Sequence, residues 1–389
     1  MKFLVQNSFW SLRLTLSVLY WSGFWIPKED QMKKRNYIIP LFFFMFVVGI
    51  YITAQFGDLC RVWGDVPLMT GTSFLLFTNI SLGLKMFNLF WKVMEIGTLV
   101  QEADDELTAA KSSQGREIVK RWDREATVLF YCFAFLSFVT VAGWGTSAEK
   151  NQLPMRAWYP YNTSKSPAYE LTYVHQIVAV SLGATVNVSL DTLVTSLMAQ
   201  CSCRLRLLAL NLSTLGEDLV VSEQKQFSPE QMKSLTLNLR RCVERHQSVL
   251  RAADHLQDLF SGSILIQVTV SMVIICVTAY QLAFETKDLV RFVSMLAYFF
   301  CMTLQLFLYC YQGHQLSEQS VQVAGAAYEM PWYNCHTPFR REILMMMVRA
   351  RRISKITAAG FTTLSLSAFM SIMKASYTFF TVLRSVEEI

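Results

Sequence analysis

The sequence has few charged residues for its length. Only 16% of the 389 residues are Asp, Glu, Lys or Arg, whereas a soluble protein has about 25% and needs them at its surface. By contrast, 53% of the chain is hydrophobic, 13% is aromatic and the mean hydropathy is +0.31. These figures exclude an ordinary soluble enzyme or binding domain and indicate that a lipid bilayer surrounds much of the chain.

The sequence also lacks the motifs that carry catalysis or bind metals. It has no paired carboxylates, nucleophile elbow or glycine-rich phosphate loop, and its five histidines are far apart. Among the nine cysteines, Cys201 and Cys203 stand too close in sequence for a zinc knuckle. We therefore expect no enzyme activity, no cofactor, no metal site and no structural disulfide.

What the chain does have is a series of long uncharged runs. A helix needs about 20 mainly apolar residues to cross the hydrocarbon core. The runs are Asn36–Gly57, Val66–Leu84, Ala126–Ala148, Leu171–Leu190, Leu259–Phe284, Phe292–Ser317 and Ile356–Met373, the last continuing to Leu383. They are continuous, unlike the alternating segments of a membrane β-barrel. The predicted fold class is an all-α, polytopic membrane protein with seven transmembrane helices.

The basic residues between the runs predict the orientation. Of the 35 Lys and Arg residues, 25 lie in the N-terminal segment and alternate loops, and 6 lie on the other side. Basic loops stay in the cytoplasm, so we expect a cytoplasmic N-terminus and an external C-terminus. This orientation disfavours a G-protein-coupled receptor, as does the absence of Asp-Arg-Tyr, of Asn-Pro-x-x-Tyr and of a cysteine in the loop Glu149–Glu170.

The loops and runs divide the chain into six segments. They are a cytoplasmic N-terminal segment with an interfacial helix at Leu14–Pro27 (1–35), spans one to four (36–200), cytoplasmic helical extensions forming an anchor (201–258), spans five and six (259–317), a cytoplasmic anchor helix (318–355) and the seventh span (356–386). Apolar residues of the extensions recur at helical spacing: Leu235, Leu239, Cys242, Val249, Leu256 and Leu259. This stripe either packs within the chain or forms a subunit interface.

The seventh run carries a stripe of polar residues. At helical spacing, one face holds Thr363, Ser367, Ser371, Lys374, Thr378 and Ser385. Such a stripe either forms a tight seam between helices or lines water. Lys374 lies about 15 Å from the outer end of the span at 1.5 Å per residue. At that depth a charge needs a partner or an aqueous lumen, which favours a pore-lining helix.

The C-terminal stretch resembles the signature of the insect odorant receptors. The resemblance is carried by Tyr328-Glu-Met-Pro-Trp332-Tyr333, Arg340-Arg341-Glu-Ile-Leu344, Ile356-Thr-Ala-Ala-Gly-Phe361 and Ser376-Tyr377-Thr-Phe-Phe380. It implies an odorant-gated, non-selective cation channel in the plasma membrane of a sensory dendrite. The implied partners are co-receptor subunits in a hetero-oligomer, a tetramer, with a small volatile odorant and membrane lipid. No nucleic acid, cofactor or G protein is implied.

The resemblance also implies site residues. The short loop 200–258 is typical of an odour-tuning subunit, because the co-receptor has a much longer one. The family's gate aligns with Val382 and Val386, and Lys374, Thr378 and Ser385 would line the pore. A pocket in the outer half of spans two to six would use Phe74, Phe77, Thr78, Phe135, Ser137, Phe138, Val141, Tyr173, Gln176, Ile177, Val277 and Tyr280.

Two positions differ from the family pattern, and two other classes of membrane protein remain as alternatives. Ile353 and Gly360 stand where the family often has Pro and Lys, which leaves the geometry of the break before the last span open. A gustatory-type ligand-gated channel would share the topology but usually ends in a Thr-Tyr…Gln-Phe pattern, which this chain lacks. A membrane transporter would have internal repeats and helices broken at the midplane, and neither is evident in the sequence.

One sequon lies in a predicted external loop and carries the first testable prediction. Asn162-Thr163-Ser164 is an acceptor for N-glycosylation. We expect glycosidase treatment to increase the electrophoretic mobility of the expressed chain and Asn162→Gln to abolish that shift. An unchanged shift in the Asn162→Gln variant would exclude this site.

Overall fold

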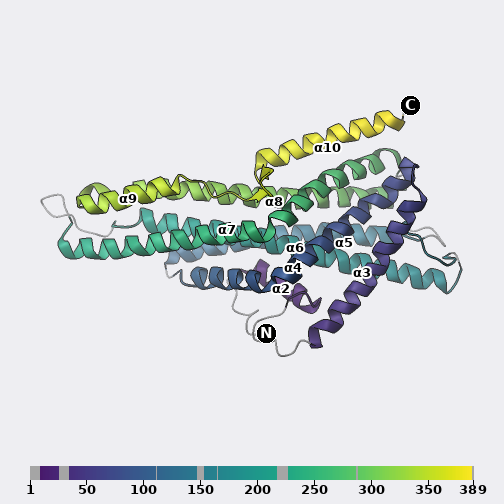
Figure 1. The fold of residues 1–389 in the computed structure, drawn as a ribbon, viewed down its shortest axis with the longest axis horizontal. Helices are drawn as coiled ribbons and strands as arrows, with labels where there is room; N and C mark the ends of the chain where they lie inside the picture. The colour runs from purple at the N-terminus through teal and green to yellow at the C-terminus, as the bar shows by residue number, and fades with distance from the viewer. Residues whose placement is uncertain are drawn as a thin grey trace.

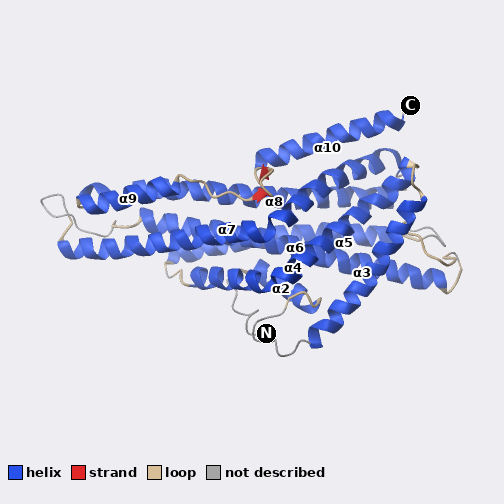
Figure 2. Ribbon diagram, viewed as in Figure 1, coloured by secondary structure: helices blue, strands red, loops and turns tan. Residues whose placement is uncertain are grey.

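The computed structural model describes residues 9–25, 35–110, 112–146, 153–163, 165–216, 227–285 and 288–387. Almost all of these residues are helical (Figure 2). The helices are α2 (Trp10–Trp21), α3 (Arg35–Arg61), α4 (Val66–Thr108), α5 (Ser113–Thr146), α6 (Ala168–Ser213), α7 (Pro229–Tyr280), η2 (Gln281–Glu285), α8 (Leu289–Glu329), η3 (Trp332–Asn334), α9 (Thr337–Ala350) and α10 (Leu366–Glu387). They form one elongated bundle, with α10 set apart beside α7 and α8 (Figure 1).

Seven of these helices are long and apolar enough to cross a membrane within the described residues. The spans are Ile38–Arg61, Leu68–Thr108, Ser113–Thr146, Ala168–Ser213, Pro229–Phe284, Leu289–Glu329 and Leu366–Ser385. The prediction of seven membrane-spanning helices is confirmed. Several helices continue well beyond the uncharged runs, because α-helical hydrogen bonding does not end where the apolar sequence ends.

Local sequence explains where several long helices begin. The Asp65 side chain accepts a hydrogen bond from the Leu68 amide at 3.2 Å and starts α4. Ser228 and Gln231 form a reciprocal capping box at the start of α7, which satisfies two amides that the helix itself cannot pair. Asp288 accepts from the Arg291 amide at 3.1 Å and starts α8. Each cap fixes a point at which the chain turns back into the bundle.

Helix α6 is the centre of the bundle. It packs against α2, α3, α4, α5, α7 and α8, and every residue from Val186 to Leu205 is buried. A helix buried on all sides has apolar or small side chains all round, and its polar residues must be hydrogen-bonded inside the protein. The polar side chains of α6 therefore need hydrogen-bond or ion-pair partners on the neighbouring helices.

The helical extensions of α6 and α7 pack within the chain. The whole predicted stripe from Leu235 to Leu259 is buried. Arg204 of α6 donates to Glu106 of α4 at 2.6 Å, and Ser248 of α7 hydrogen-bonds with both. The stripe was interpreted either as packing within the chain or as a subunit interface, and packing within the chain accounts for its burial.

The N-terminal helix is shorter and begins earlier than expected. α2 ends at Trp21, and residues 26–34, with the expected end at Pro27, lie outside the described residues. Leu12, Leu16 and Leu19 are buried against α5 and α6, whereas Trp21 is exposed. This one-sided burial suits a helix that covers the side of the bundle.

The predicted start of the seventh span is wrong. Residues 356–365 are not helical: β1 (Thr357–Ala358) pairs antiparallel with β2 (Thr362–Thr363), the small hairpin drawn red in Figure 2. Ala359 and Gly360 turn with positive φ, and Gln257 of α7 hydrogen-bonds both the amide and the carbonyl of Thr357 at 2.7 and 3.0 Å. Thr363 therefore belongs to the hairpin and not to the polar stripe.

The anchor segment 318–355 is also divided differently from the single helix expected. α8 continues to Glu329, a turn with the short η3 follows, and α9 begins at Thr337. Pro338 occupies the first turn of α9, where a missing amide hydrogen costs nothing. The segment folds back so that α9 packs along α8.

The hairpin is held against α8 by a close approach at Gly313. A Cβ at this position would lie 2.4 Å from Leu364 Cβ and 3.0 Å from the Leu364 carbonyl oxygen. Only glycine allows the segment preceding α10 to pack this closely on α8, since any larger residue would overlap the hairpin backbone.

This contact gives a matched pair of substitutions. Gly313→Ala overpacks the contact and is expected to lower the free energy of unfolding by about 1–3 kcal/mol. Gly325→Ala lies on the same helix, where an added Cβ has nothing within 4 Å, so it is expected to be neutral or slightly stabilising. Thermal denaturation of the purified protein in detergent compares them. Equal midpoints would contradict the assigned contact.

Candidate ligand-binding cavity

A cavity of about 50 Å³ lies between four of the spans. Each span presents residues at helical spacing: Leu75, Thr78, Asn79 and Leu82 from α4; Ser137, Thr140, Val141 and Trp144 from α5; Val180, Gly183, Ala184 and Asn187 from α6; and Tyr298, Cys301 and Met302 from α8. Residues at i, i+3, i+4 and i+7 share one helix face. The cavity is therefore where one face of each helix converges.

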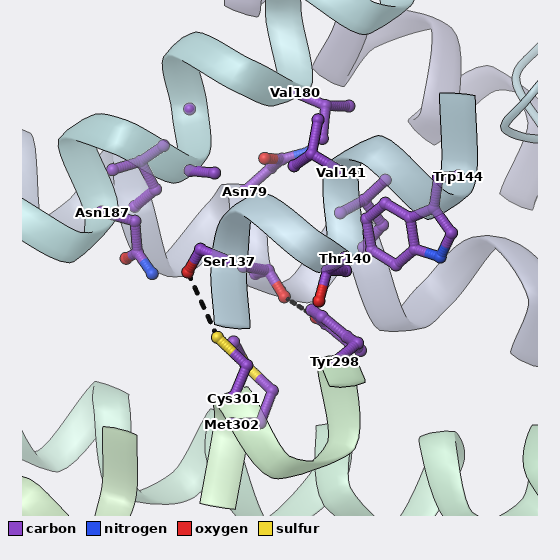
Figure 3. Close-up of a pocket in the computed structure, with 15 residues that line it drawn as sticks. Asn79, Ser137, Thr140, Val141, Trp144, Val180, Asn187, Tyr298, Cys301 and Met302 are labelled. Carbon is purple, nitrogen blue, oxygen red and sulfur yellow. Dashed lines mark hydrogen bonds between the residues drawn. The ribbon is translucent and has the colours of Figure 1, made fainter. Parts of the chain in front are cut away.

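Hydroxyl groups in the cavity wall are paired with one another or with the backbone (Figure 3). The hydroxyls of Thr78 and Tyr298 are 2.5 Å apart, and Tyr298 also donates to the Phe74 carbonyl at 3.3 Å. Ser137 hydrogen-bonds with the Cys301 sulfur at 3.2 Å. Thr140 donates to the Leu136 carbonyl at 2.8 Å. These pairings leave the wall largely apolar.

One end of the cavity is aromatic. The rings of Trp144 and Tyr298 have centroids 5.2 Å apart, and Phe74 packs behind both at 5.7 and 5.5 Å. Tilted and edge-on contacts at these distances are favourable for aromatic rings. This cluster joins α4, α5 and α8 and would offer flat apolar surface to a ligand.

The other end of the cavity is polar. Asn187 accepts a hydrogen bond from the Lys85 ammonium at 3.0 Å, and Lys85 forms a buried ion pair with Asp191 at 2.6 Å. Asp191 also accepts from the Tyr309 hydroxyl at 2.7 Å and from the Gln305 side chain. Replacing a paired charge at such depth leaves its partner unpaired and costs about 3–5 kcal/mol. The network therefore holds α4, α6 and α8 in one arrangement.

Three of the predicted ligand-binding residues line the cavity. These are Thr78, Ser137 and Val141. Phe74 is buried directly behind the wall, where its ring contacts Trp144 and Tyr298. The structure thus brings residues from the second and third spans together at one site.

Tyr173, Gln176 and Ile177 lie toward the end of the bundle next to segment 153–163. Tyr173 donates to the Gly145 carbonyl of α5, and Ile177 packs against the same glycine. The Gln176 amide hydrogen-bonds both the amide and the carbonyl of Met155 at 3.2 and 3.1 Å. These residues tie the segment and α5 to α6 and do not line the cavity.

The other predicted pocket residues are not at the cavity wall. Phe135 and Phe138 point outward from the bundle, with 65% and 71% of their surface exposed. Phe77 is half-buried against the core on α4. Val277 and Tyr280 are buried near the end of α7, where Tyr280 contacts Phe284.

The cavity also contains residues that the sequence prediction missed, most importantly Trp144, Tyr298, Asn79 and Asn187. Trp144 lies seven residues after Ser137, two turns along the same face, so extending the helix face would have found it. Tyr298 could not be found in this way, because the prediction names no pocket residue on the sixth span from which a helix face could be extended.

Segment 153–163 covers the adjoining end of the bundle. Trp158 donates its backbone amide to the Ala54 carbonyl at 3.0 Å, and the Arg61 guanidinium lies 4.7 Å from the Trp158 ring centroid. Tyr159 accepts a hydrogen bond from Gln176 at 3.4 Å, and burial raises the pKa of Tyr159 to about 12. Asn162 is exposed on this segment.

The predicted pore residues face away from the bundle. Lys374, Thr378 and Ser385 are exposed along one side of α10, and Val382 on the same side is 54% exposed. On the opposite side, Ser376 is buried and donates to the Met272 carbonyl of α7 at 3.3 Å. The side chain of Val386 lies outside the described part of the structure.

The comparisons with known proteins agree on one family. The family model described as 7tm Odorant receptor matches residues 65–377. Odorant receptor Or1 of Anopheles gambiae is 25% identical, covering 98% of this chain and 96% of its own, and Odorant receptor 94a of Drosophila melanogaster is 25% identical, covering 97% of both. Neither relative is the co-receptor. The chain belongs to the insect odorant receptor family.

Solved structures support the same fold. The olfactory receptor OR5 of Machilis hrabei in complex with eugenol superimposes with a TM-score of 0.84 at 19% identity, over 96% of this chain and 97% of that one. A second structure of the same receptor superimposes with a TM-score of 0.83. The agreement over nearly the full length shows that the elongated helical bundle is a known architecture.

Two substitutions on α5 test the assignment of the cavity. Trp144→Ala removes a large part of the aromatic wall, so we expect the half-maximal concentrations for volatile agonists to shift by more than about tenfold, with bulkier agonists favoured. Phe138→Ala is the control, because Phe138 is on the same helix but faces outward, and a change below about twofold is expected. Dose–response curves in co-receptor-expressing cells measure both. A larger effect of Phe138→Ala would move the ligand site out of this cavity.

Proposed function

We propose that this chain is the odour-tuning subunit of an odorant-gated, non-selective cation channel. A small volatile binds in the cavity between α4, α5, α6 and α8, and the chain assembles with co-receptor subunits, as a tetramer, around a central pore lined by α10. The observation that carries the proposal is a largely apolar cavity between four membrane-spanning helices of a chain that belongs to the odorant receptor family.

The wall chemistry suits a small volatile. Burial of apolar surface stabilises a bound ligand by about 25 cal/mol per Å², and a few placed polar groups add selectivity. Eugenol, the ligand of the Machilis receptor structure, is an aromatic molecule with oxygen substituents, and the aromatic and polar ends of this cavity match that type of molecule. Other small aromatic or aliphatic volatiles have the same combination of groups.

The size of the cavity suggests how binding opens the channel. Its volume of about 50 Å³ corresponds to only a few water molecules at about 10–15 Å³ each. A volatile of ten or more heavy atoms must therefore move the helices or side chains around it. A ligand shifts a conformational equilibrium only through its different affinity for the two states, and a ligand that widens this cavity favours the arrangement in which α4, α5 and α8 have moved apart.

The exposure of α10 supports its role as pore lining. Ser367, Ser371, Lys374, Thr378 and Val382 fall on the side that faces away from the bundle. In an assembly around a central axis, this side meets the lumen, and Val382 narrows it as a hydrophobic gate that wets on opening. A ring of four lysines would repel cations, whereas one tuning subunit among co-receptor subunits would contribute a single Lys374 charge, which is easier to reconcile with cation flow.

The proposed orientation follows from the basic loops. The extensions of α6 and α7, together with α9, form a cytoplasmic anchor, and segment 153–163 covers the external end. The subunit resides in the plasma membrane, in the dendrite of a sensory neuron. With this orientation a volatile reaches the cavity from the side that carries Asn162.

Current recordings test the channel and its gate. We expect volatile-evoked cation current in cells that express this chain with a co-receptor and none from this chain alone. Val382→Ala removes apolar bulk from the lumen, so basal current is expected to rise severalfold and the half-maximal agonist concentration to fall.

Leu383→Ala is the matched control for the gate. Leu383 is the next residue, turned about 100° away and half-buried, so it is expected to change expression but not basal current. If Val382→Ala leaves both basal current and agonist sensitivity unchanged, Val382 is not the gate. If no volatile evokes current with the co-receptor, the proposed function is wrong.

A further inference from the structure

We propose that Asn187 is the hydrogen-bond donor that selects volatiles bearing an oxygen acceptor, such as a carbonyl or ester oxygen, and that the buried Lys85–Asp191 pair positions it. This proposal rests on the proposed function and specifies the ligand class. It concerns the polar end of the cavity, where Asn187 of α6 lies across from the aromatic end marked by Trp144 (Figure 3).

The orientation of the Asn187 amide is fixed by charge. Its Oδ1 accepts a hydrogen bond from the Lys85 ammonium at 3.0 Å. An amide rotated by 180° would point its NH₂ group at the ammonium, and two donors facing each other are repulsive. The Nδ2 group is therefore directed away from Lys85. Among the described residues, Nδ2 donates no hydrogen bond to the protein, and the one hydrogen bond of this side chain is that from Lys85.

The charge that fixes Asn187 is itself held in place. Lys85 lies 2.6 Å from Asp191, and both side chains are at least 95% buried. Asp191 receives further hydrogen bonds from Tyr309 and Gln305 of α8. Charge-assisted hydrogen bonds are the strong ones, and a carboxylate with three donors has little freedom. Lys85 therefore cannot turn away from Asn187 without breaking a network that spans three helices.

Other polar groups of the wall are less suited to this role. Thr78 and Tyr298 hydrogen-bond with each other, and Ser137 is paired with Cys301. Asn79, the second asparagine of the cavity, donates its Nδ2 to the Gln55 side chain of α3 at 2.8 Å. Asn187 thus differs from Asn79 in the direction of its donor, although both are buried and both line the cavity.

The spacing along α6 defines what the ligand must span. Val180 and Asn187 both line the cavity and are seven residues apart, which is about 10 Å along the helix. A ligand with an aromatic or alkyl body at one end and an acceptor at the other fits this length. A buried amide donor left without an acceptor costs free energy, so a hydrocarbon of the same shape binds less well.

Pairs of volatiles that differ only in the acceptor provide the test. Acetophenone and α-methylstyrene, and 2-octanone and 2-methyl-1-octene, exchange C=O for C=CH₂ at nearly constant shape. In cells that express the chain with a co-receptor, the ketone of each active pair is expected to have a half-maximal concentration about five- to tenfold lower. For Asn187→Leu, this ratio is expected to fall to about one, with the response to the hydrocarbon retained.

Asn79→Leu is the matched control. It removes an asparagine of the same cavity whose donor is already used, so any change should affect both members of a pair equally and leave the ratio near its original value. If Asn187→Leu keeps the wild-type ratio, or Asn79→Leu abolishes it, Asn187 is not the selecting donor. A complete lack of response to all four volatiles and to a broader panel would contradict the proposed function, whereas responses with no ketone preference contradict only this proposal.

The positioning role of the ion pair needs its own variant, because removing one charge alone can prevent folding. The double substitution Lys85→Met with Asp191→Leu removes both charges at similar volume, which proteins often tolerate. We expect surface expression to persist and the ketone preference to weaken by at least half, since the Asn187 amide is then free to rotate. Lys85→Arg keeps the cation and is expected to retain more of the preference. An unchanged preference in the double variant would remove the ion pair from the proposal.

Discussion

The burial of α6 on all sides is the constraint on which the rest of the structure depends. Within the described part of the chain, six helices pack around it, so a buried polar side chain on α6 can be satisfied only by its neighbours. Asp191 and Asn187 meet this requirement through Lys85 of α4 and Tyr309 of α8. The same contacts fix the distances between the helices that surround the cavity, so the architecture of the core and the shape of the cavity have one physical origin.

Helix α8 links the cavity to the last helix. Tyr298 lines the cavity, Tyr309 hydrogen-bonds Asp191, and Gly313 packs against the hairpin that precedes α10. Their separations of 11 and 4 residues keep all three near one face of the helix. A ligand that displaces Tyr298 therefore acts on the same rigid element that supports the base of the proposed pore helix, which is a physical route for coupling between the two sites.

The fold was largely predictable because the bilayer imposes it. Long uncharged runs have few alternatives to membrane helices, and the described residues of six of the seven runs are helical, although several of these helices extend well beyond the runs. The seventh was misplaced because an uncharged run does not reveal a turn: the hairpin depends on positive φ at Ala359 and Gly360 and on the side chain of Gln257, 100 residues away. Such a tertiary contact leaves no local pattern.

The cavity was only partly predictable for a related reason. Depth in the membrane selected the stretches of α4 and α5 that contribute to the cavity wall, but depth does not distinguish the inner from the outer side of a helix. Phe138 and Trp144 are both aromatic residues of α5, and lipid favours aromatic side chains as readily as a binding site does. The pairing of Lys85 with Asp191 was likewise absent from the prediction, since it required the register between α4 and α6.

Helix α10 makes few contacts with the rest of the chain, and this affects how variants of the protein behave. Hardly any of its membrane-spanning segment is buried within the chain, so this chain alone does little to fix its position, and in the proposed assembly the neighbouring subunits would do so. In that proposed assembly, the packing of α10 depends on subunit concentration. Substitutions on its outer surface would reduce the number of assembled complexes that leave the endoplasmic reticulum, and a loss of signal from such a variant has to be separated from a loss of conductance by counting receptors at the cell surface.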